Sequence, residues 1–361
     1  WFQISLLIGV GLRGQSPFRE CLTSGWTLDA QGRAMSKSLG NVIEPEKVIK
    51  KFGAEVLRLW VSSVEYYEDV RLSDTILERL ADAYRKLRNT FRYALGNLGD
   101  FDPAKNAVPA SELFEIDQWI LIRTEELVRK CLGWYAEYAF HKVYRACYDF
   151  ATIDLSSIYF DVLKDRLYTS APDSKARRSA QTAIYRINYA LVRLLAPLMV
   201  FTTDEVWSDM AKPSGAPESV HMAEFPRPEE LTEGLPEAAR QRSANWDKLL
   251  PVRDQVLKSL ETARQEKFIG TGLEARVHLD AGADLYPLLE SYRAELPSLF
   301  IVSQVSLANG AEGLAVKVEK ADGSKCERCW KYRTDIGQDG DFPTICGSCA
   351  SSVKELLTSA G

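Results

Sequence analysis

Four cysteines near the end of the chain have the spacing of metal ligands. Cys326 and Cys329 form one Cys-x-x-Cys pair, and Cys346 and Cys349 form a second pair after sixteen intervening residues. Each pair can turn two thiolates toward one ion, and the loop between the pairs lets them converge. The sequence therefore predicts one Zn²⁺ ion with four cysteine ligands.

Cations and aromatic rings surround these cysteines, and side chains of this kind bind phosphates and stack on bases. A zinc ion that only staples a segment too short to form its own core is an open alternative. Disulfides in a secreted protein are disfavoured because the chain is long and shows no export signal. The residues predicted to contact nucleic acid are Arg328, Trp330, Lys331 and Arg333.

A polar loop near the start of the chain carries a second candidate site. It contains Met35, Ser36, Lys37 and Ser38 and is bounded by glycines. A lysine flanked by hydroxyls suits closure over a polyphosphate, where the ammonium would offset charge that develops as pyrophosphate leaves. The spacing alone also allows an ordinary exposed lysine that contacts only solvent.

The composition is that of a globular protein and restricts where a polyanion could bind. The chain has 361 residues, enough for two or three domains, and a net charge of −5. Nucleic-acid contacts must therefore come from local patches. The apolar run at residues 4–12 is too short to span a membrane. We expect a cytoplasmic protein without membrane association, in which Cys21, Cys131 and Cys147 are reduced and buried.

Hydrophobic periodicity predicts a mainly helical chain with a small sheet near its end. Long helices with short connections should form an antiparallel bundle, and residues 212–240 should run over a surface as a linker. The predicted helices cover residues 4–12 (buried), 73–98, 116–138, 140–170, 174–196, 243–265 and about 284–294, with a helix-loop-helix around Gly53 and a capping box at Thr202 and Glu205. The predicted strands cover residues 21–27, 274–280, 299–307 and 314–318.

The helix predicted at residues 73–98 carries a row of cations opposite its apolar face. Ser73 can cap its first turn. Such a face usually contacts solvent, but beside a nucleic acid it would contact phosphates. The cations are Arg85, Lys86, Arg88 and Arg92.

The stretch from Gly32 to Asn41 resembles the Lys-Met-Ser-Lys-Ser signature loop of class I aminoacyl-tRNA synthetases. Other motifs narrow the resemblance to the bacterial isoleucyl-tRNA synthetases, and the cysteine pairs resemble the zinc module that ends these enzymes. The similarity runs in order over nearly the whole chain, which makes the set specific. The motifs include Trp60-Val61-Ser62-Ser63, Asp154-Leu155-Ser156-Ser157, Asp161-Val162-Leu163-Lys164-Asp165-Arg166-Leu167-Tyr168 and Cys326-Glu327-Arg328-Cys329-Trp330.

This resemblance implies an activity. Lys37 would help ATP, with Mg²⁺, react with isoleucine to form the adenylate, and Met35, Ser36 and Ser38 would shape the ATP-binding loop. The helical bundle would bind the anticodon stem and loop of tRNA(Ile), with the cations of helix 73–98 on its phosphates. The zinc module would dock near the anticodon end, and the enzyme would act as a monomer.

The resemblance also implies a fold and a division into parts. We expect a mainly α chain: the end of a Rossmann-like α/β catalytic fold, an antiparallel helical anticodon-binding bundle, a small α+β unit and a four-cysteine zinc module. The expected parts are residues 1–63 (catalytic end, with the signature loop at 34–38), 64–211 (stem-contact segment and bundle), 212–242 (linker), 243–320 (helix and α+β unit) and 321–361 (zinc module).

Two departures from the family pattern limit the expected activity. The first signature position, normally lysine, is Ala34. The His-Ile-Gly-His tetrapeptide of the active site is not among the 361 residues, whose three histidines match no such pattern. The chain alone is therefore expected not to aminoacylate tRNA. A free-standing tRNA-binding zinc protein derived from a synthetase is the alternative, and the four-cysteine module argues against a ligase for valine or leucine.

Overall fold

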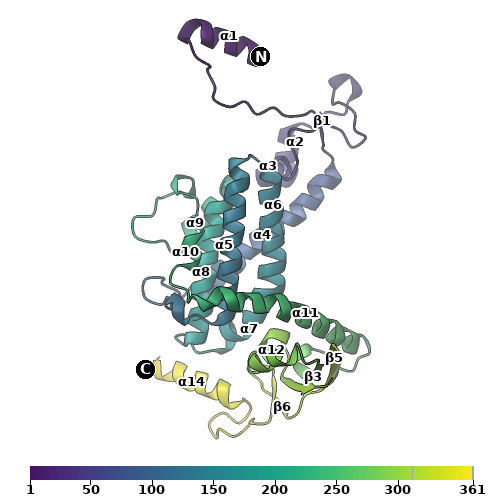
Figure 1. Cartoon of the computed structure of the whole chain (residues 1–361), viewed down its shortest axis with the longest axis vertical. Coiled ribbons are helices and arrows are strands. Elements are labelled where there is room, and N and C mark those ends of the chain that lie inside the picture. The colour runs from purple at the N-terminus through teal and green to yellow at the C-terminus, as the bar shows by residue number, and fades with distance from the viewer. Residues whose placement is uncertain (311, 360–361) are drawn as a thin grey trace. The chain divides into compact units, whose positions relative to one another are not determined.

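The computed structural model describes residues 1–310 and 312–359, and the chain divides into two compact units (Figure 1). One unit combines Trp1–Arg85 with Trp134–Arg145, and the other combines Lys86–Gly133 with Ala146–Gly361. The five-part division expected from the sequence stays a prediction. The helices that contribute residues to both units are α4 (Asp74–Asn97), α5 (Glu115–Ala136) and α6 (Phe140–Asp149).

The first unit is built around a small apolar core and a pair of short strands. Strand β1 (Thr27–Leu28) pairs in parallel with β2 (Val70–Arg71). Helices α2 (Pro45–Phe52) and α3 (Ala54–Ser63) meet at Gly53, where φ is 92°, so the predicted helix-loop-helix is confirmed. The buried members of the core are Val48, Val56, Trp60, Leu72, Leu77, Leu80 and Ala81.

The strand predicted over residues 21–27 is mostly wrong, because only its last residue joins a ladder. The Gly25 N–H donates to the Tyr66 carbonyl over 2.8 Å. A Cβ on Gly25 would lie 2.2 Å from the Glu68 carbonyl oxygen, so only glycine allows this approach. The segment before β1 is therefore held by single backbone contacts rather than by continuous strand pairing.

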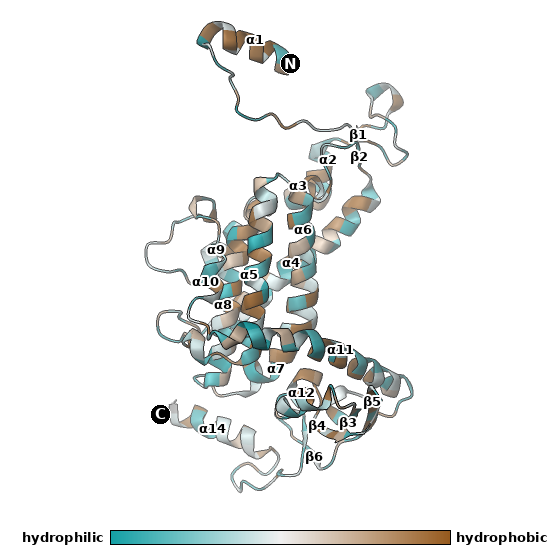
Figure 2. Cartoon of the chain, in the orientation of Figure 1, coloured by the Kyte–Doolittle hydropathy of each residue, from teal (hydrophilic) through white to brown (hydrophobic). Residues whose placement is uncertain are grey.

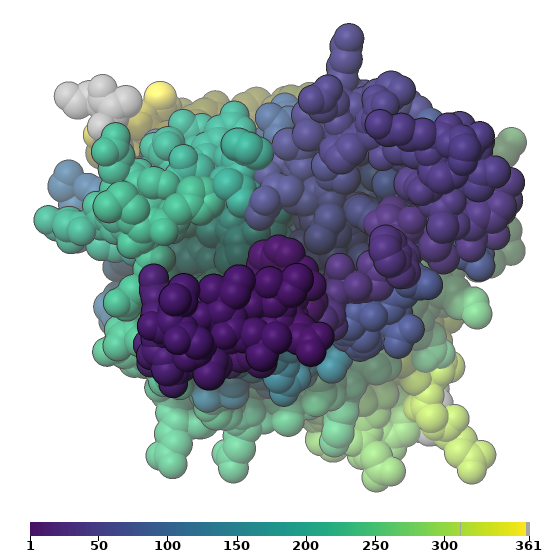
Figure 3. Space-filling model, turned by 90° about the horizontal axis from the view of Figure 1, so that it is seen from above, coloured from purple at the N-terminus to yellow at the C-terminus, as the bar shows by residue number. Residues whose placement is uncertain are grey.

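Helix α1 (Phe2–Arg13) confirms the first predicted helix but not its burial. Gly9 is its only buried residue, and Leu12 is 80% exposed. Figure 2 shows the helix coloured as hydrophobic, and Figure 3 shows its side chains at the surface in the foreground. Gly9 lies against Pro17, but the described residues of this unit provide no apolar surface that covers the rest of the helix.

The long helices of the second unit confirm the predicted bundle (Figure 1). The chain is helical through α6, a π-helical stretch (Phe150–Tyr159) and α7 (Phe160–Thr169). Helix α8 (Lys175–Leu195) packs against both α7 and α9 (Val200–Asp209). Proline lies between these helices rather than inside them, as its missing N–H requires.

The capping box predicted at Thr202 is wrong. Helix α9 begins at Val200, so Thr202 lies inside its first turn and is buried. The Met199 carbonyl accepts both the N–H and the hydroxyl of Thr203, over 2.9 and 2.7 Å. The chain therefore resumes a helix directly after the turn that ends α8, earlier than the capping pattern indicates.

The three cysteines outside the terminal pairs differ in burial. Cys131 and Cys147 are buried as predicted, with their sulfurs 3.9 Å apart. Cys21 is exposed, so its predicted burial is wrong. It lies in the segment before β1 that forms no strand and covers no core.

The segment between α9 and α11 (Ala238–Gln265) lies against the bundle. Helix α10 (Glu229–Thr232) buries Leu231. Glu230 accepts a hydrogen bond of 2.7 Å from Arg193 on α8. Helix α11 begins before its predicted start and contains Pro251.

A three-stranded sheet packs beside α11, with β3 (Ala275–Ala281) in the centre. It pairs in parallel with β4 (Gln304–Asn309) and antiparallel with β5 (Leu314–Lys320). Alternate residues of β3 are fully buried, which confirms the predicted half-buried strand. The strand predicted from residue 299 begins late, because Leu296–Phe300 forms helix α13 instead.

The remaining elements complete the fold, and the predicted mainly helical fold with short sheets is confirmed. They are α12 (Tyr286–Ser291), β6 (Ser324–Lys325), β7 (Tyr332–Arg333) and α14 (Gly347–Ser359), with single turns at Lys37–Leu39, Ala110–Glu112, Val220–Met222 and Gly272–Glu274.

A buried ionic network joins the helices of the second unit. Asp117 on α5 is 0% exposed, and its carboxylate accepts hydrogen bonds from Tyr159 (2.7 Å), Arg166 (2.6 and 3.1 Å) and Ser179. Burial, reinforced by the Asp117 charge, raises the pKa of Tyr159. Arg166 also donates to the Ala176 carbonyl, so the guanidinium is satisfied on both sides.

Replacing this carboxylate should destabilise the second unit strongly. Asp117→Ala leaves the Arg166 charge without its counter-ion, and we expect the free energy of unfolding to fall by about 3–5 kcal/mol. Urea unfolding followed by far-UV circular dichroism measures this. The matched control is Glu112→Ala, which removes an exposed pair with Lys175 and should cost less than about 1 kcal/mol. Equal losses in the two variants would contradict the role of the network.

Candidate functional site

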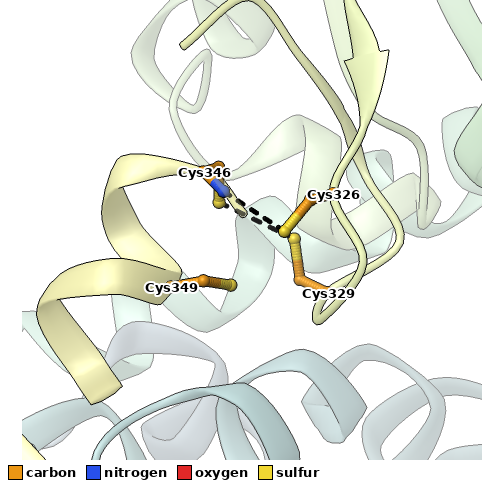
Figure 4. A group of neighbouring side chains, drawn as sticks. All are labelled: Cys326, Cys329, Cys346 and Cys349. Carbon is orange, nitrogen blue, oxygen red and sulfur yellow. Dashed lines mark hydrogen bonds between the residues drawn. The ribbon is translucent and has the colours of Figure 1, made fainter. Parts of the chain in front are cut away.

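The four terminal cysteines meet in one cluster (Figure 4). Cys326 and Cys329 belong to the turn between β6 and β7, whereas Cys346 and Cys349 lie at the start of α14. All four Sγ atoms lie within 4.8 Å of one another, and those of Cys329 and Cys346 are 3.9 Å apart. Zn–S bonds of about 2.3 Å in a tetrahedron place sulfurs about 3.8 Å apart. The cluster is therefore consistent with a zinc site.

The thiols differ in how readily they ionise. Burial raises the pKa of Cys326, but backbone N–H groups of Cys329, Cys346 and Arg328 outweigh it and lower the pKa to about 6. The Cys346 N–H donates to the Cys326 sulfur over 3.3 Å. Burial raises the pKa of Cys329, and raises that of Cys349 to about 11. Because zinc binds thiolates, its binding would release protons from the latter two.

The turn that carries the first cysteine pair is closed by two backbone hydrogen bonds. The Cys326 N–H donates to the Lys331 carbonyl, and the Trp330 N–H donates to the Cys326 carbonyl, each over 2.9 Å. The closure holds Trp330 at φ 63°, in the left-handed region that favours glycine. Trp330 is 61% exposed, and the Lys325 ammonium lies 5.6 Å from the centroid of its ring.

The helix that carries the second cysteine pair is capped by a carboxylate. The Gly347 N–H at the start of α14 donates to the Asp335 carboxylate over 3.0 Å.

The zinc module has little core of its own. The apolar residues around the sulfurs are Ile345 and Ala350, with Ile336, Phe342 and Val353 partly buried. So small a core agrees with a metal that supplies folding energy.

Four residues of this module were predicted to contact nucleic acid, and two of them bond to α7 instead. Lys331 is 9% exposed, and its ammonium lies 2.6 Å from the Asp165 carboxylate. Arg328 donates to the Thr169 carbonyl. Trp330 and Arg333 are exposed by contrast. The structure thus separates side chains that hold the module from side chains that are accessible to a ligand.

The lysine loop is fixed by a buried carboxylate and an amide. Asp29 Oδ1 accepts the backbone N–H groups of Gln31 (3.0 Å) and Arg33 (2.9 Å), and its Oδ2 accepts the Asn41 amide (2.9 Å) and the Arg33 Nε (2.8 Å). Asn41 in turn accepts the Ser36 N–H over 2.9 Å. The Asn41 amide, then the Arg33 N–H, hold the pKa of Asp29 well below its usual range.

The signature residues themselves divide into anchors and one free cation. Met35 packs against the core of the first unit. The Ser36 hydroxyl accepts the Leu39 N–H over 3.3 Å and lies 3.1 Å from the Ser38 hydroxyl. Lys37 is exposed, and within residues 1–310 and 312–359 its ammonium has no hydrogen bond or ion pair. The loop therefore presents an uncommitted positive charge from a fixed backbone.

The cations predicted on α4 are all exposed. Arg85 forms an ion pair with Asp82. Arg88 and Arg92 line a hollow of about 340 Å³ together with α9 residues that include Glu205. Their predicted contacts with tRNA stay predictions.

Sequence reasoning missed the carboxylates that organise both sites. Asp29 had a local signal, because an aspartate before a glycine turn commonly accepts backbone N–H groups two residues on. Asp165 had none, because it is 166 residues from Lys331 in the sequence. Asp335 lies in the loop between the cysteine pairs, where no periodicity marks it.

Among the described helices, none is both long and apolar enough to cross a membrane.

Three known protein families match successive parts of the chain. Residues 1–73 match the class I tRNA synthetases for isoleucine, leucine, methionine and valine. Residues 117–279 match the anticodon-binding domain of tRNA ligases. Residues 323–351, which contain the cysteine cluster, match the zinc finger found in FPG and IleRS proteins.

Curated relatives match almost the whole chain. The isoleucine–tRNA ligases of Syntrophotalea carbinolica and Geobacter sulfurreducens are 49% and 48% identical over 98% of it. That of Thermotoga maritima is 44% identical over 98%. The chain spans 39% of the length of each of these relatives. From these matches and from its three ordered parts, the chain belongs to the isoleucine–tRNA ligases and corresponds to a C-terminal portion of them.

Proposed function

We propose that, within a longer ligase chain, these residues supply the lysine loop of the ATP site and the surface that binds tRNA(Ile). The complete enzyme would activate isoleucine with ATP and Mg²⁺ and transfer it to that tRNA. The observation that carries this proposal is the clamp of Asp29 and Asn41, which fixes the loop backbone, while Lys37 has no partner among the residues that the structure describes.

A free ammonium on a fixed loop is suited to transition-state stabilisation. Charge grows on the phosphates as pyrophosphate leaves, and a cation already in place stabilises it without reorganisation. Lys37 could not do this if an internal carboxylate held it. Ala34 leaves the loop one cation short of the family pattern, so Lys37 would carry more of the charge stabilisation.

The tRNA-binding surface is proposed to include the exposed residues of the zinc module. Trp330 offers a stacking face, and Lys325 and Arg333 offer charges to phosphates. The exposed arginines of α4 offer a second cationic surface on a chain whose net charge is −5. The zinc ion itself would be structural, because four cysteines leave no position open for a substrate.

The chain alone is proposed to be inactive in aminoacylation. Its sequence lacks the His-Ile-Gly-His tetrapeptide, so that part of the ATP site would have to come from elsewhere in a full-length enzyme. We expect that enzyme to work as a monomer in the cytoplasm.

Replacing Lys37 should lower the rate of ATP–pyrophosphate exchange far more than the affinity for isoleucine. In a full-length enzyme with this sequence, Lys37→Ala should slow isoleucine-dependent ATP–pyrophosphate exchange about 100-fold or more. The isoleucine KM should change little, because the ammonium acts on the transition state. Lys50→Ala, which removes another exposed lysine of the same unit, is the control and should change neither. Equal losses of rate and affinity would argue against this role.

Removing a zinc ligand should unfold the module alone. Cys326→Ser should lower bound zinc below one ion per chain and expose residues 323–358 to hydrogen exchange, because the metal supplies their folding energy. The bundle should keep its helical circular dichroism. Cys21→Ser, at an exposed cysteine outside the cluster, should leave zinc and exchange unchanged. Loss of the whole helical signal would show that the module and bundle fold as one.

The chain should bind tRNA through phosphate contacts. We expect it to enrich isoleucine tRNAs from total bacterial tRNA, as sequencing of the bound fraction would reveal. Affinity should fall steeply with salt, and Arg333→Ala should reduce the salt slope by about one. Arg264→Ala, at an exposed arginine of α11, should leave the slope unchanged. An absence of binding at moderate salt would exclude the proposed tRNA role of this chain.

A further inference from the structure

Arg71 lies beside the lysine loop, on a strand that is distant from the loop in sequence. Its strand, β2, pairs in parallel with β1 (Figure 2), and Arg71 is the direct partner of Leu28. Leu28 also forms an antiparallel bridge with Ala34, at the start of the signature residues. Arg71, Leu28 and Ala34 therefore form one row across three neighbouring segments of the chain.

The side chains at both ends of this row are on the exposed face of the first unit. Residues paired across strands project to the same side, and successive residues along a strand project to opposite sides. Met35 and Leu72, each one residue beyond the row, pack in the apolar core of this unit. Ala34 and Arg71 must then project away from that core, and both are exposed.

The Arg71 guanidinium lies against the turn that begins the loop. A Cβ on Gly32 would lie 3.2 Å from Arg71 Nη2 and 3.5 Å from its Nε and Cζ, so the guanidinium packs over the bare α carbon of Gly32. The Trp60 indole N–H donates to the Arg71 carbonyl over 3.3 Å, which fixes the backbone from which this side chain extends. The charge is therefore held next to the loop rather than directed into open solvent.

Arg71 has the same uncommitted charge as Lys37. Its guanidinium has no hydrogen bond or ion pair among the residues that the structure describes. Arg33 provides the contrast, because its guanidinium lies 2.8 Å from the Asp29 carboxylate. An arginine presents its donors as a planar fork that matches the oxygens of a phosphate, whereas a lysine is a point charge. An open guanidinium at this position is thus suited to a phosphate group.

We propose that Arg71 is a second phosphate-contacting residue of the ATP site, which reaches over the start of the loop from β2 while Lys37 extends from the loop itself. The inference rests on the proposed function, which brings ATP to this loop. A polyphosphate carries several negative charges, and two cations from separate segments fix its position as well as neutralise it.

ATP–pyrophosphate exchange by a full-length ligase with this sequence measures the contribution of Arg71. We expect Arg71→Ala to lower kcat/KM for ATP about 10- to 100-fold, the effect of losing a charged hydrogen bond, and to change the isoleucine KM less than about twofold. Arg71→Lys should lose less, because it keeps the charge. Arg79→Ala removes an exposed arginine of α4 in the same unit and should change neither constant.

A rescue variant separates a role in charge from a purely structural one. Ala34 is in the same row and on the same face as Arg71, so Ala34→Lys adds an ammonium to that face. In the Arg71→Ala enzyme, this change should restore kcat/KM for ATP by about fivefold or more, and in the unaltered enzyme it should change the constant less than about twofold. If Arg71 only packs on Gly32, Ala34→Lys restores nothing and the proposal is overturned.

Lys37→Ala, measured in parallel, distinguishes failure of this inference from failure of the proposed function. If Lys37→Ala slows exchange but Arg71→Ala does not, Arg71 is outside the ATP site and the proposed function stands. If the full-length enzyme shows no isoleucine-dependent exchange, both proposals fail. Urea unfolding is measured for each variant. Arg71→Gln keeps a polar side chain without the charge, and it replaces Arg71→Ala, with the same expected loss and rescue, if the alanine variant is destabilised.

Discussion

The buried carboxylate of Asp117 is the constraint on which the second unit depends. From α5 it bonds to Tyr159 at the end of the π-helical stretch, to Arg166 on α7 and to Ser179 on α8. Because a buried charge without its partner is so costly, these elements must stay together. Helix α7 then carries Asp165, whose carboxylate holds Lys331 of the zinc module. One carboxylate thus helps to place the helix that holds the zinc module.

The lysine loop and the turn that carries the first cysteine pair are ordered in the same way. In each, short polar bonds fix the backbone and leave one side chain exposed. Asp29 and Asn41 fix the loop that presents Lys37, and backbone hydrogen bonds fix the turn that presents Trp330. Ordering these segments in advance reduces the entropy that a ligand must remove on binding. The neighbouring Lys331 shows the contrast, because its pairing with Asp165 makes it part of the support.

The sequence was sufficient for the long helices and for the grouping of the cysteines. Apolar residues at three- and four-residue steps, with prolines at the ends, predict α4, α5 and α8 to within two residues. Short elements were harder to predict from the sequence. Helix α13 lies where a strand was predicted to start, and β1 is only two residues long. Propensity is a weak guide where a few tertiary bonds decide the backbone, as they do before β1.

Local sequence patterns did not indicate which residues far apart in the chain would pair. The sequence marked Lys331 as a cation beside a cysteine, but its partner on α7 could be found only in three dimensions. The same is true of a cavity of about 580 Å³ in the second unit, whose walls combine the start of α5 with α11 and α12. Helix α1 shows the reverse case, because its apolar composition predicted burial that depends on a covering surface the described residues do not provide.

The π-helical stretch at Phe150–Tyr159 makes the length of this helix as important as its composition. A π turn accommodates an additional residue relative to an α turn, and each residue of an α-helix advances the chain by about 100° around the axis. Tightening the stretch to an α-helix with all its residues kept would rotate α7 by about that angle for each additional residue. Asp165 and Arg166 would then face away from the zinc module and from Asp117. The stretch therefore sets the angular register of α7.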